Sequence, residues 1–243
     1  MLGYVVVVAM VVCAIISVVI VTAGEGARQT RLTRDRNANG RVLIAALGAS
    51  DLTGEGTRDP ERENWIAQLA AQLPAHVDIA TFGIGGAWLA DARIEQVPKA
   101  VAIKPDIVIG WLIVNDLTQG ALLAEYIQIL DAVLADLAQP GTQILLGNAP
   151  RLWELPAFTG DAEDLAELRR EVAVWNDSLA AVATKFDVVV VDLHQNPVEI
   201  EDLSEDGFHP SPAGHAKLAA TFRPHVLAAL DQTRNARQTA AID

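Results

Sequence analysis

The sequence predicts an α/β fold, in which a three-layer α/β/α sandwich with a five-stranded parallel sheet follows one N-terminal transmembrane helix. From residue 41 onward, apolar runs rich in β-branched residues alternate with amphipathic segments, as expected of strands that alternate with helices. Several of these runs, such as DIVIGWLIV at 106–114, are apolar throughout, which is typical of parallel strands covered on both faces. An uncharged stretch, Tyr4–Ala23, precedes them and predicts the transmembrane helix.

As a helix, the stretch Tyr4–Ala23 would span about 30 Å, the thickness of a bilayer's hydrocarbon core. We therefore expect residues 1–24 to be a retained membrane anchor. A cleaved signal peptide is the alternative, because Val21, Thr22 and Ala23 resemble a small-residue cleavage site.

Residues 25–40 are polar and rich in arginine, and they predict a solvated tether whose arginines can contact anionic lipid headgroups. By the positive-inside rule, these arginines favour a cytoplasmic location for the domain that follows, with export as the alternative. We expect residues 41–232 to form a single domain and residues 233–243 to form a C-terminal tail.

The expected elements follow one another in regular alternation. The strands are predicted at 42–47, 77–82, 106–114, 142–147 and 187–193, and the helices at 61–73, 89–103, 121–137, 162–185 and 213–230. The last helix follows HPSPAG, where Ser211 can cap its first turn and Pro212 suits that turn.

Composition narrows the classes of partner. The net charge of −13 argues against a nucleic-acid partner, because nucleic-acid phosphates would be repelled. Cys13 is the single cysteine, so no zinc-type Cys/His spacing exists, and we expect neither a metal nor a cofactor. The glycine-rich segment at 81–88 lacks the full G-x-G-x-x-G spacing of a dinucleotide site. The oligomeric state stays open.

Polar or glycine-rich segments follow every predicted strand except the last, and one lies a little beyond it. They occupy residues 48–51, 81–88, 115–116, 148–150 and 205–215. Parallel sheets bind ligands at the carboxyl ends of their strands, so these segments are expected to meet at one edge of the sheet.

Together these segments hold the parts that acyl transfer needs. Ser50 is a candidate nucleophile, which needs a base such as His209 to take its proton. Asp206 lies three residues before His209 and can orient its imidazole. The N–H of Ser50, an N–H of the turn at 83–86 and the Asn115 amide are suitable donors for an oxyanion. Each part alone is weak evidence, but their place at successive strand ends makes coincidence improbable.

At these positions the chain resembles the SGNH hydrolase superfamily, also called GDSL-type lipases and esterases, over residues 41–232. Its G-D-S-x-x-x-G block matches residues 48–54, and its N-x-G-x-x-G block matches residues 81–86. Its G-x-N-D block matches residues 113–116, and its D-x-x-H block matches residues 206–209. The resemblance implies a flavodoxin-like five-stranded parallel sheet, catalysis by Ser, Asp and His without metal, and ester or thioester substrates.

By the same resemblance, Ser50, Asp206 and His209 are the catalytic residues, and Ser50, Gly86 and Asn115 form the oxyanion hole. Three positions depart from the family pattern: Ala49 for Asp, Thr81 for Asn and Ile113 for Gly. None of these departures removes a catalytic group, and they bear on the shape of the oxyanion loop and on the width of the pocket.

The resulting hypothesis is a membrane-tethered serine esterase that cleaves carboxylic esters through an acyl-enzyme. Its substrate would be a lipid or lysophospholipid acyl ester or a small acyl ester. A glycan O-acetylesterase is one alternative, and a non-catalytic, membrane-tethered binding module on the same fold is another.

Other residues near the strand ends receive simpler interpretations. Trp88, Trp153 and Phe158 lie on loops and are candidates for lining an acyl pocket. Trp111 is interpreted as a core residue, and Asp116 as a residue that holds the loop after Asn115. The remaining candidates, Asp192, His194 and His215, are interpreted as structural.

Overall fold

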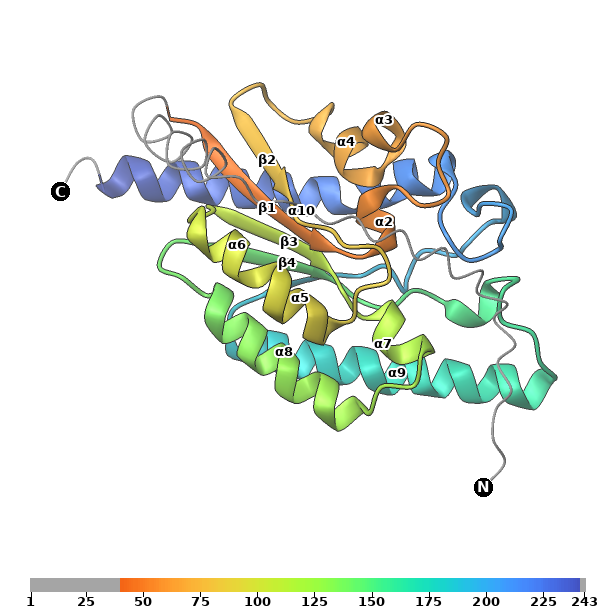
Figure 1. Ribbon diagram of the computed structural model, residues 1–243. Helices are drawn as coiled ribbons and strands as arrows, with labels where there is room; N and C mark the ends of the chain where they lie inside the picture. The colour runs from red at the N-terminus through yellow and green to blue at the C-terminus, as the bar shows by residue number, and fades with distance from the viewer. Residues whose placement is uncertain (1–39, 241–243) are drawn as a thin grey trace.

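Five parallel strands form the central sheet of the computed structural model, in the order β2-β1-β3-β4-β5 (Figure 1). The structure describes residues 40–240. The strands are β1 (Val42–Gly48), β2 (Val77–Thr81), β3 (Ile107–Trp111), β4 (Gln143–Gly147) and β5 (Val189–Val191). The predicted three-layer fold with a five-stranded parallel sheet is therefore confirmed.

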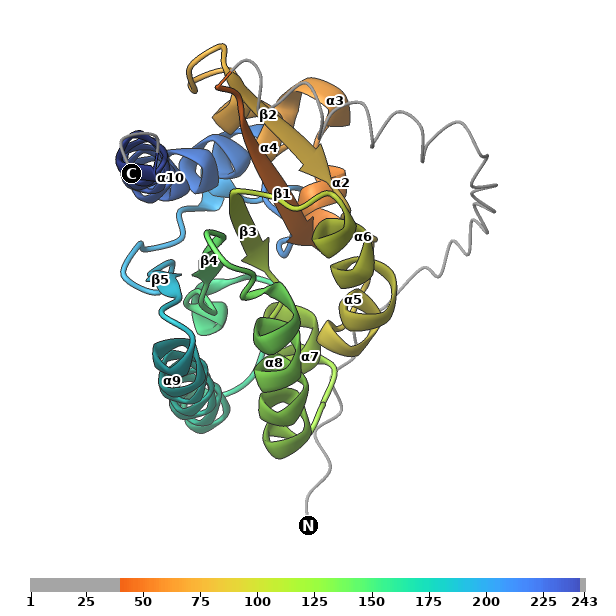
Figure 2. The same ribbon diagram turned by 90° about the vertical axis from the view of Figure 1, so that its left-hand side faces the viewer.

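Helices cover both faces of this sheet (Figure 2). The helices packed on one face are α4 (Trp65–Ala70) and α10 (Pro212–Ala240). Those on the other face are α5 (Leu89–Glu95), α6 (Val97–Ala102), α8 (Leu123–Leu137) and α9 (Ala162–Lys185). The shorter elements are α2 (Ser50–Thr53), α3 (Pro60–Glu63), α7 (Val114–Thr118) and the 3₁₀ turns η1 (Leu152–Glu154) and η2 (Ile200–Asp202).

Burial on both faces explains the apolar runs seen in the sequence. All seven residues of β1 are buried, and residues 42–47 alternate between two core clusters because successive side chains point to opposite faces. In one cluster the ring of Trp65 lies 4.6 Å from that of Phe222. In the other, Tyr126 lies 4.9 Å from Trp175.

The third strand is shorter than predicted. Its expected range, 106–114, ends at Trp111, and Val114 already begins α7. Trp111 pairs with Gly48, the last residue of β1, so the chain has no β1 partner beyond that point. The turn that follows places Asn115 and Asp116 in a short helix.

Two predicted helices are each divided into two. The range 61–73 overlaps α3 and includes α4, and the two are separated by Asn64, which has an extended backbone and caps α4 by accepting a hydrogen bond from Ala67 N. The range 89–103 contains α5 and α6, separated at Gln96. Pro98 lies in the first turn of α6, where the N–H that proline lacks is not needed.

The last helix extends ten residues beyond its predicted end, because α10 runs to Ala240. Most of the expected C-terminal tail is therefore helical. The end of α10 is attached to the rest of the domain by Arg237, which donates to Arg41 O at 3.0 Å and to Asp106 Oδ1 at 2.5 Å.

The N-terminal predictions concern residues outside the described range. The expected anchor at 1–24 and most of the tether at 25–40 lie there. Within residues 40–240, no helix combines the length and the apolar character that crossing a bilayer requires.

Candidate active site

Ser50 begins α2 directly after β1, on a turn that other elements hold in place. Gly48 N donates to Gln96 Oε1 at 3.1 Å, and Gln96 Nε2 donates to Gly48 O at 2.9 Å. A side chain at Gly48 would approach the Cβ of Leu52 to 2.9 Å, so the turn needs glycine there. Ser50 O accepts hydrogen bonds from Thr53 Oγ1 and Glu55 N, which fixes the chain on the other side of the serine.

The three predicted catalytic side chains form one hydrogen-bonded chain. His209 Nε2 lies 3.0 Å from Ser50 Oγ, and His209 Nδ1 lies 2.5 Å from Asp206 Oδ2. With its proton on Nδ1, the neutral imidazole donates to Asp206 and leaves Nε2 free to accept the Ser50 proton. The structure thus brings Ser50, His209 and Asp206 together across 159 residues of sequence.

Asp206 lies in a site that stabilises its charge. Its Oδ1 accepts from Ser204 Oγ, Phe208 N and His209 N at 2.8–2.9 Å. Partial burial opposes ionisation, but the hydrogen bonds from His209, Phe208 and Ser204 outweigh it and lower the pKa of Asp206 to about 2. The carboxylate is therefore ionised at neutral pH and can hold the imidazole of His209.

The loop that carries Asp206 and His209 is tied to its surroundings. Gly207 has a φ of 68°, a left-handed conformation that favours glycine. Its carbonyl accepts from Ala157 N at 3.2 Å, which joins the loop to the segment after η1. Ser204 N donates to His209 O at 2.8 Å and closes the loop.

The predicted oxyanion residues lie on two adjoining segments. Asn115 Nδ2 donates to Ala87 O at 2.9 Å, and Leu89 N donates to Asp116 Oδ2 at 2.9 Å. These two bonds attach α7 to the glycine-rich loop, which agrees with the interpretation of Asp116. Burial raises the pKa of Asp116 to about 6. Gly86 is exposed and has a φ of 74°, and it immediately precedes Ala87.

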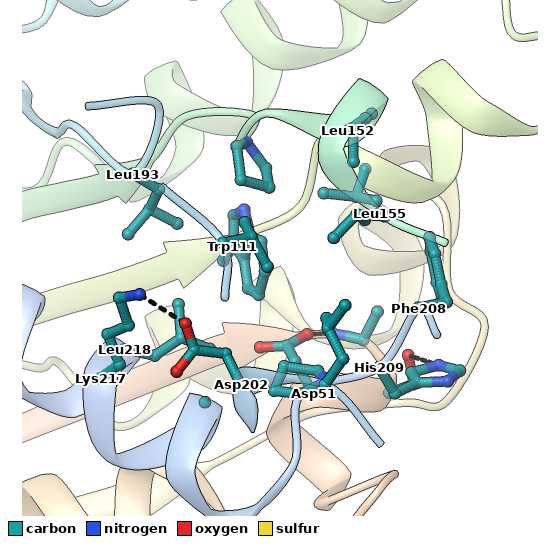
Figure 3. Close-up of a pocket in the computed structure, with 18 of the residues that line it drawn as sticks. Asp51, Trp111, Leu152, Leu155, Leu193, Asp202, Phe208, His209, Lys217 and Leu218 are labelled. Carbon is teal, nitrogen blue, oxygen red and sulfur yellow. Dashed lines mark hydrogen bonds and ion pairs between the residues drawn. The ribbon is translucent and has the colours of Figure 1, made fainter. Parts of the chain in front are cut away.

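A mostly apolar pocket with an interior volume of about 120 Å³ adjoins Ser50 and His209. Figure 3 shows Trp111 near the middle of this pocket, with His209 and Phe208 at one end and Lys217 at the other. The apolar side chains that line it include Trp111, Leu112, Ile113, Leu152, Leu155, Leu193, Phe208 and Leu218. Lys217 and Asp202 form an ion pair at the end away from His209.

The three aromatic residues predicted to line an acyl pocket, Trp88, Trp153 and Phe158, are not among the residues that line this pocket. Trp88 donates through Nε1 to Gln119 Oε1 at 3.1 Å. The ring of Trp153 lies 5.3 Å from His194 and beneath the guanidinium of Arg169 at 5.4 Å. These partners turn both indoles toward neighbouring elements, a direction that position on a loop does not specify.

Phe158 approaches the site indirectly, because its ring lies 6.0 Å from Phe208, which in turn lies 4.9 Å from the ring of His209. Trp111, interpreted from the sequence as a core residue, packs against both core clusters and also lines the pocket, and its indole donates to Asn148 O at 3.1 Å. Its position at the end of β3 was the available signal, since strand ends border the site.

Sequence reasoning also missed Gln96 and Asp51. Gln96 is fully buried and holds the turn before Ser50. No sequence signal distinguished it, because it lies inside the range 89–103 that was predicted as one helix. Asp51 is 7% exposed and lines the same pocket as Ser50.

The residues interpreted as structural make hydrogen bonds outside the chain of Ser50, His209 and Asp206. Asp192 Oδ1 accepts from Asn148 Nδ2 at 2.9 Å, and His194 N donates to Asn148 Oδ1 at 3.1 Å. His215 is buried in α10, and its Nε2 lies 3.1 Å from Glu55 O. Over residues 40–240, no group of three or more His, Cys, Asp or Glu side chains is arranged to hold a metal ion.

Known proteins resemble this chain in sequence and in fold. The model of the GDSL-like lipase/acylhydrolase family matches residues 21–217. A 5-oxoprolinase subunit from Mycobacterium marinum is 27% identical over 228 residues, covering 87% of this chain and 83% of that protein.

Among solved structures, the crystal structure of TesA has a TM-score of 0.63 at 20% identity and covers 77% of this chain and 99% of that one. The acetyl xylan esterase AlAXEase has a TM-score of 0.62 at 17% identity, covering 76% of this chain and 100% of that one. At these identities the structures show a shared fold.

Proposed function

The chain belongs to the GDSL-like lipase/acylhydrolase family, within the SGNH hydrolases, and we propose that it cleaves carboxylic esters through an acyl-enzyme formed on Ser50. Family membership makes it a hydrolase of ester bonds. The hydrogen-bonded chain from Ser50 through His209 to Asp206, beside an apolar pocket, is the observation that carries the mechanism.

In the proposed first step, Ser50 Oγ attacks the acyl carbonyl while His209 Nε2 takes the hydroxyl proton. Asp206 holds the imidazole by Nδ1 and stabilises the imidazolium that forms. Collapse of the tetrahedral intermediate breaks the ester bond, and the proton passes from His209 to the leaving alcohol. Water then repeats the sequence as nucleophile, which releases the acid and restores the Ser50 hydroxyl.

The oxyanion of the tetrahedral intermediate would be held by the N–H groups of Ser50 and Gly86 and by the side chain of Asn115. One hydrogen of Asn115 Nδ2 bonds to Ala87 O, and an amide nitrogen carries a second hydrogen that can donate to substrate. The hydrogen bond to Ala87 O therefore orients the Asn115 amide and leaves its second N–H available for the oxyanion.

We propose that the acyl group of the substrate is longer than acetyl. The pocket beside Ser50 and His209 is lined mainly by Leu, Ile, Trp and Phe side chains, and each buried methylene contributes about 0.8 kcal/mol. An acetyl group would leave most of this apolar surface unfilled. A glycan O-acetylesterase is the second candidate, supported by the similar fold of AlAXEase.

A series of p-nitrophenyl esters with acyl chains from acetate to laurate, together with acetylated xylan, separates these substrates. We expect kcat/KM to rise beyond acetate. Highest activity on acetate and on acetylated xylan would favour the O-acetylesterase.

Labelling with a fluorophosphonate probe tests the nucleophile. The full-length chain should label and the Ser50→Ala variant should not, whereas a non-catalytic binding module would not label in either form. Labelling that persists in Ser50→Ala would refute the assignment of Ser50.

We further propose that residues 1–24 anchor the protein in a membrane by a single span and that residues 25–40 act as the tether. The uncharged stretch Tyr4–Ala23 supports the anchor, and the arginines that follow it support a cytoplasmic catalytic domain.

A further inference from the structure

Asp51 is a buried carboxyl group that the proposed mechanism does not use. It follows Ser50 directly in the first turn of α2 and is 7% exposed. It also lines the pocket that Ser50 and His209 border, as Figure 3 shows. A carboxylate in an apolar setting is costly unless hydrogen bonds compensate it, so its partners indicate what it does.

The two carboxyl oxygens of Asp51 join the serine turn to the helical layer behind it. Oδ1 accepts a hydrogen bond from Ala49 N at 3.2 Å, and Oδ2 accepts one from Trp65 Nε1 at 2.8 Å. Trp65 is fully buried in α4 and packs on Phe222 of α10. Asp51 therefore attaches the residue before the nucleophile to the part of the core that α4 and α10 form.

Other residues hold Gly48 and Ser50 in the turn, and Asp51 holds Ala49 between them. Gln96 holds Gly48, and Glu55 N and Thr53 Oγ1 hold Ser50 O. Between them lies Ala49, whose side chain has no polar atom, at the position where the family pattern has Asp. Here the carboxylate comes from the residue after the serine instead and accepts the N–H of Ala49.

We infer that Asp51 is a positioning residue for Ser50, and that it acts in its ionised form by accepting hydrogen bonds from Ala49 N and Trp65 Nε1. The inference rests on the proposed function, because it assigns a role relative to the Ser50 nucleophile. Protonation would turn one carboxyl oxygen into a hydroxyl, which donates and is a weaker acceptor, while Ala49 N and Trp65 Nε1 both need an acceptor. One of the two hydrogen bonds that Asp51 accepts would then weaken.

Burial raises the pKa of Asp51 to about 6, and the hydrogen bond from Trp65 works against that rise. The titratable groups on the elements around the same pocket are His209, Asp202, Lys217 and, on the buried side of α10, His215. A plot of kcat/KM against pH should therefore report the protonation of Asp51 on its acid limb.

The first test measures kcat and KM across pH for the full-length chain and for Asp51→Asn, with a p-nitrophenyl ester. We expect kcat of the variant to fall by about tenfold to a hundredfold, because small misplacements of a nucleophile cost rates of this order. KM should change less than about twofold, and the acid limb should lose the protonation of Asp51. Fluorophosphonate titration counts the folded sites in each sample.

The second test keeps Asp51 and removes one of its donors. Trp65→Phe retains an aromatic ring against Phe222 and deletes the N–H that favours ionised Asp51, so the acid limb should move to higher pH. Trp175→Phe is the matched control, since Trp175 is a buried indole packed on Tyr126 on the other face of the sheet. It should leave the pH profile unchanged.

The inference is overturned if Asp51→Asn keeps kcat within about twofold and the wild-type acid limb, or if Trp65→Phe and Trp175→Phe give the same profile. Where Asp51→Asn fails to fold, the shift in Trp65→Phe decides alone. Loss of all activity in Ser50→Ala with a wild-type-like Asp51→Asn would reject only the role of Asp51. Activity that survives Ser50→Ala would reject the proposed function itself.

Discussion

The stability of the protein should depend on pH through Asp51. Its pKa is raised from 3.8 to about 6 in the folded chain by burial. Between these values the folded state binds more protons than the unfolded state, so stability falls as pH rises. The contribution is fully present below about pH 4 and is lost as pH rises through about 6.

The size of this contribution follows from the shift. A shift of about two pKa units corresponds to roughly 3 kcal/mol, and the part of it between about pH 4.5 and about pH 7.5 is roughly 2 kcal/mol. In Asp51→Asn the group no longer titrates, so this part of the pH dependence should disappear. Other effects of the substitution that do not depend on pH cancel in the comparison of the two pH values.

Urea unfolding followed by tryptophan fluorescence measures the free energy of unfolding of both chains at the two pH values. The wild-type chain should lose about 2 kcal/mol more than Asp51→Asn on going to the higher pH. Asp116→Asn should remove a similar part, because burial also raises the pKa of Asp116 to about 6. Parallel pH dependence of the wild-type and Asp51→Asn chains would refute the reasoning.

Three further outcomes are expected. Ser50→Ala and His209→Ala should each lower kcat by roughly 10³-fold or more and add little when combined, because they act as a unit; multiplicative losses would contradict this. Asn115→Ala should lower kcat by about 10²–10³-fold with little change in KM, whereas a change confined to KM would indicate substrate binding. The full-length chain should stay in membranes through alkaline carbonate washing, and a chain beginning near Asn37 should be soluble and active. Digestion of the domain in intact spheroplasts would show export, and a mature chain that starts near residue 24 would show a cleaved signal.

The fold could be predicted because buried parallel strands appear in the sequence as continuous apolar runs. The ends of the strands and helices depend on contacts between residues far apart in sequence, which the spacing of apolar residues does not reveal. The third strand stops at Trp111 because its partner β1 ends at Gly48. The helix predicted at 213–230 continues to Ala240, where Arg237 contacts Arg41 O and Asp106.

The candidate site could be predicted in part for the same reason that the fold could. Ser50 and Asn115 come shortly after strand ends, which the sheet topology brings to one edge, and His209 lies on a loop beyond the last strand. The direction of a side chain on a loop depends on partners far away in sequence, such as the Gln119 amide that binds Trp88. Position on a loop was therefore a poor guide to the aromatic lining of the pocket.

The departures from the family pattern lie near Gly48, whose contacts link the serine turn to other segments. Its carbonyl accepts from Gln96 Nε2 at 2.9 Å and from Ile84 N at 3.2 Å, so one peptide joins the serine turn to the glycine-rich loop. Gly83 adds to this contact, because a side chain there would approach the Cβ of Leu52 in α2 to 2.7 Å. The nucleophile turn is therefore hydrogen-bonded directly to the loop expected to donate to the oxyanion.

Ala49 and Ile113 are buried at 8% and 1% exposure and offer no polar side chain to this region. Support for the turn comes instead from Gln96 on one side and Asp51 on the other. The position of the serine therefore depends on two buried polar side chains outside the catalytic chain. A substitution at Gln96 should accordingly disturb both nucleophile and oxyanion loop, because Gly48 contacts both segments.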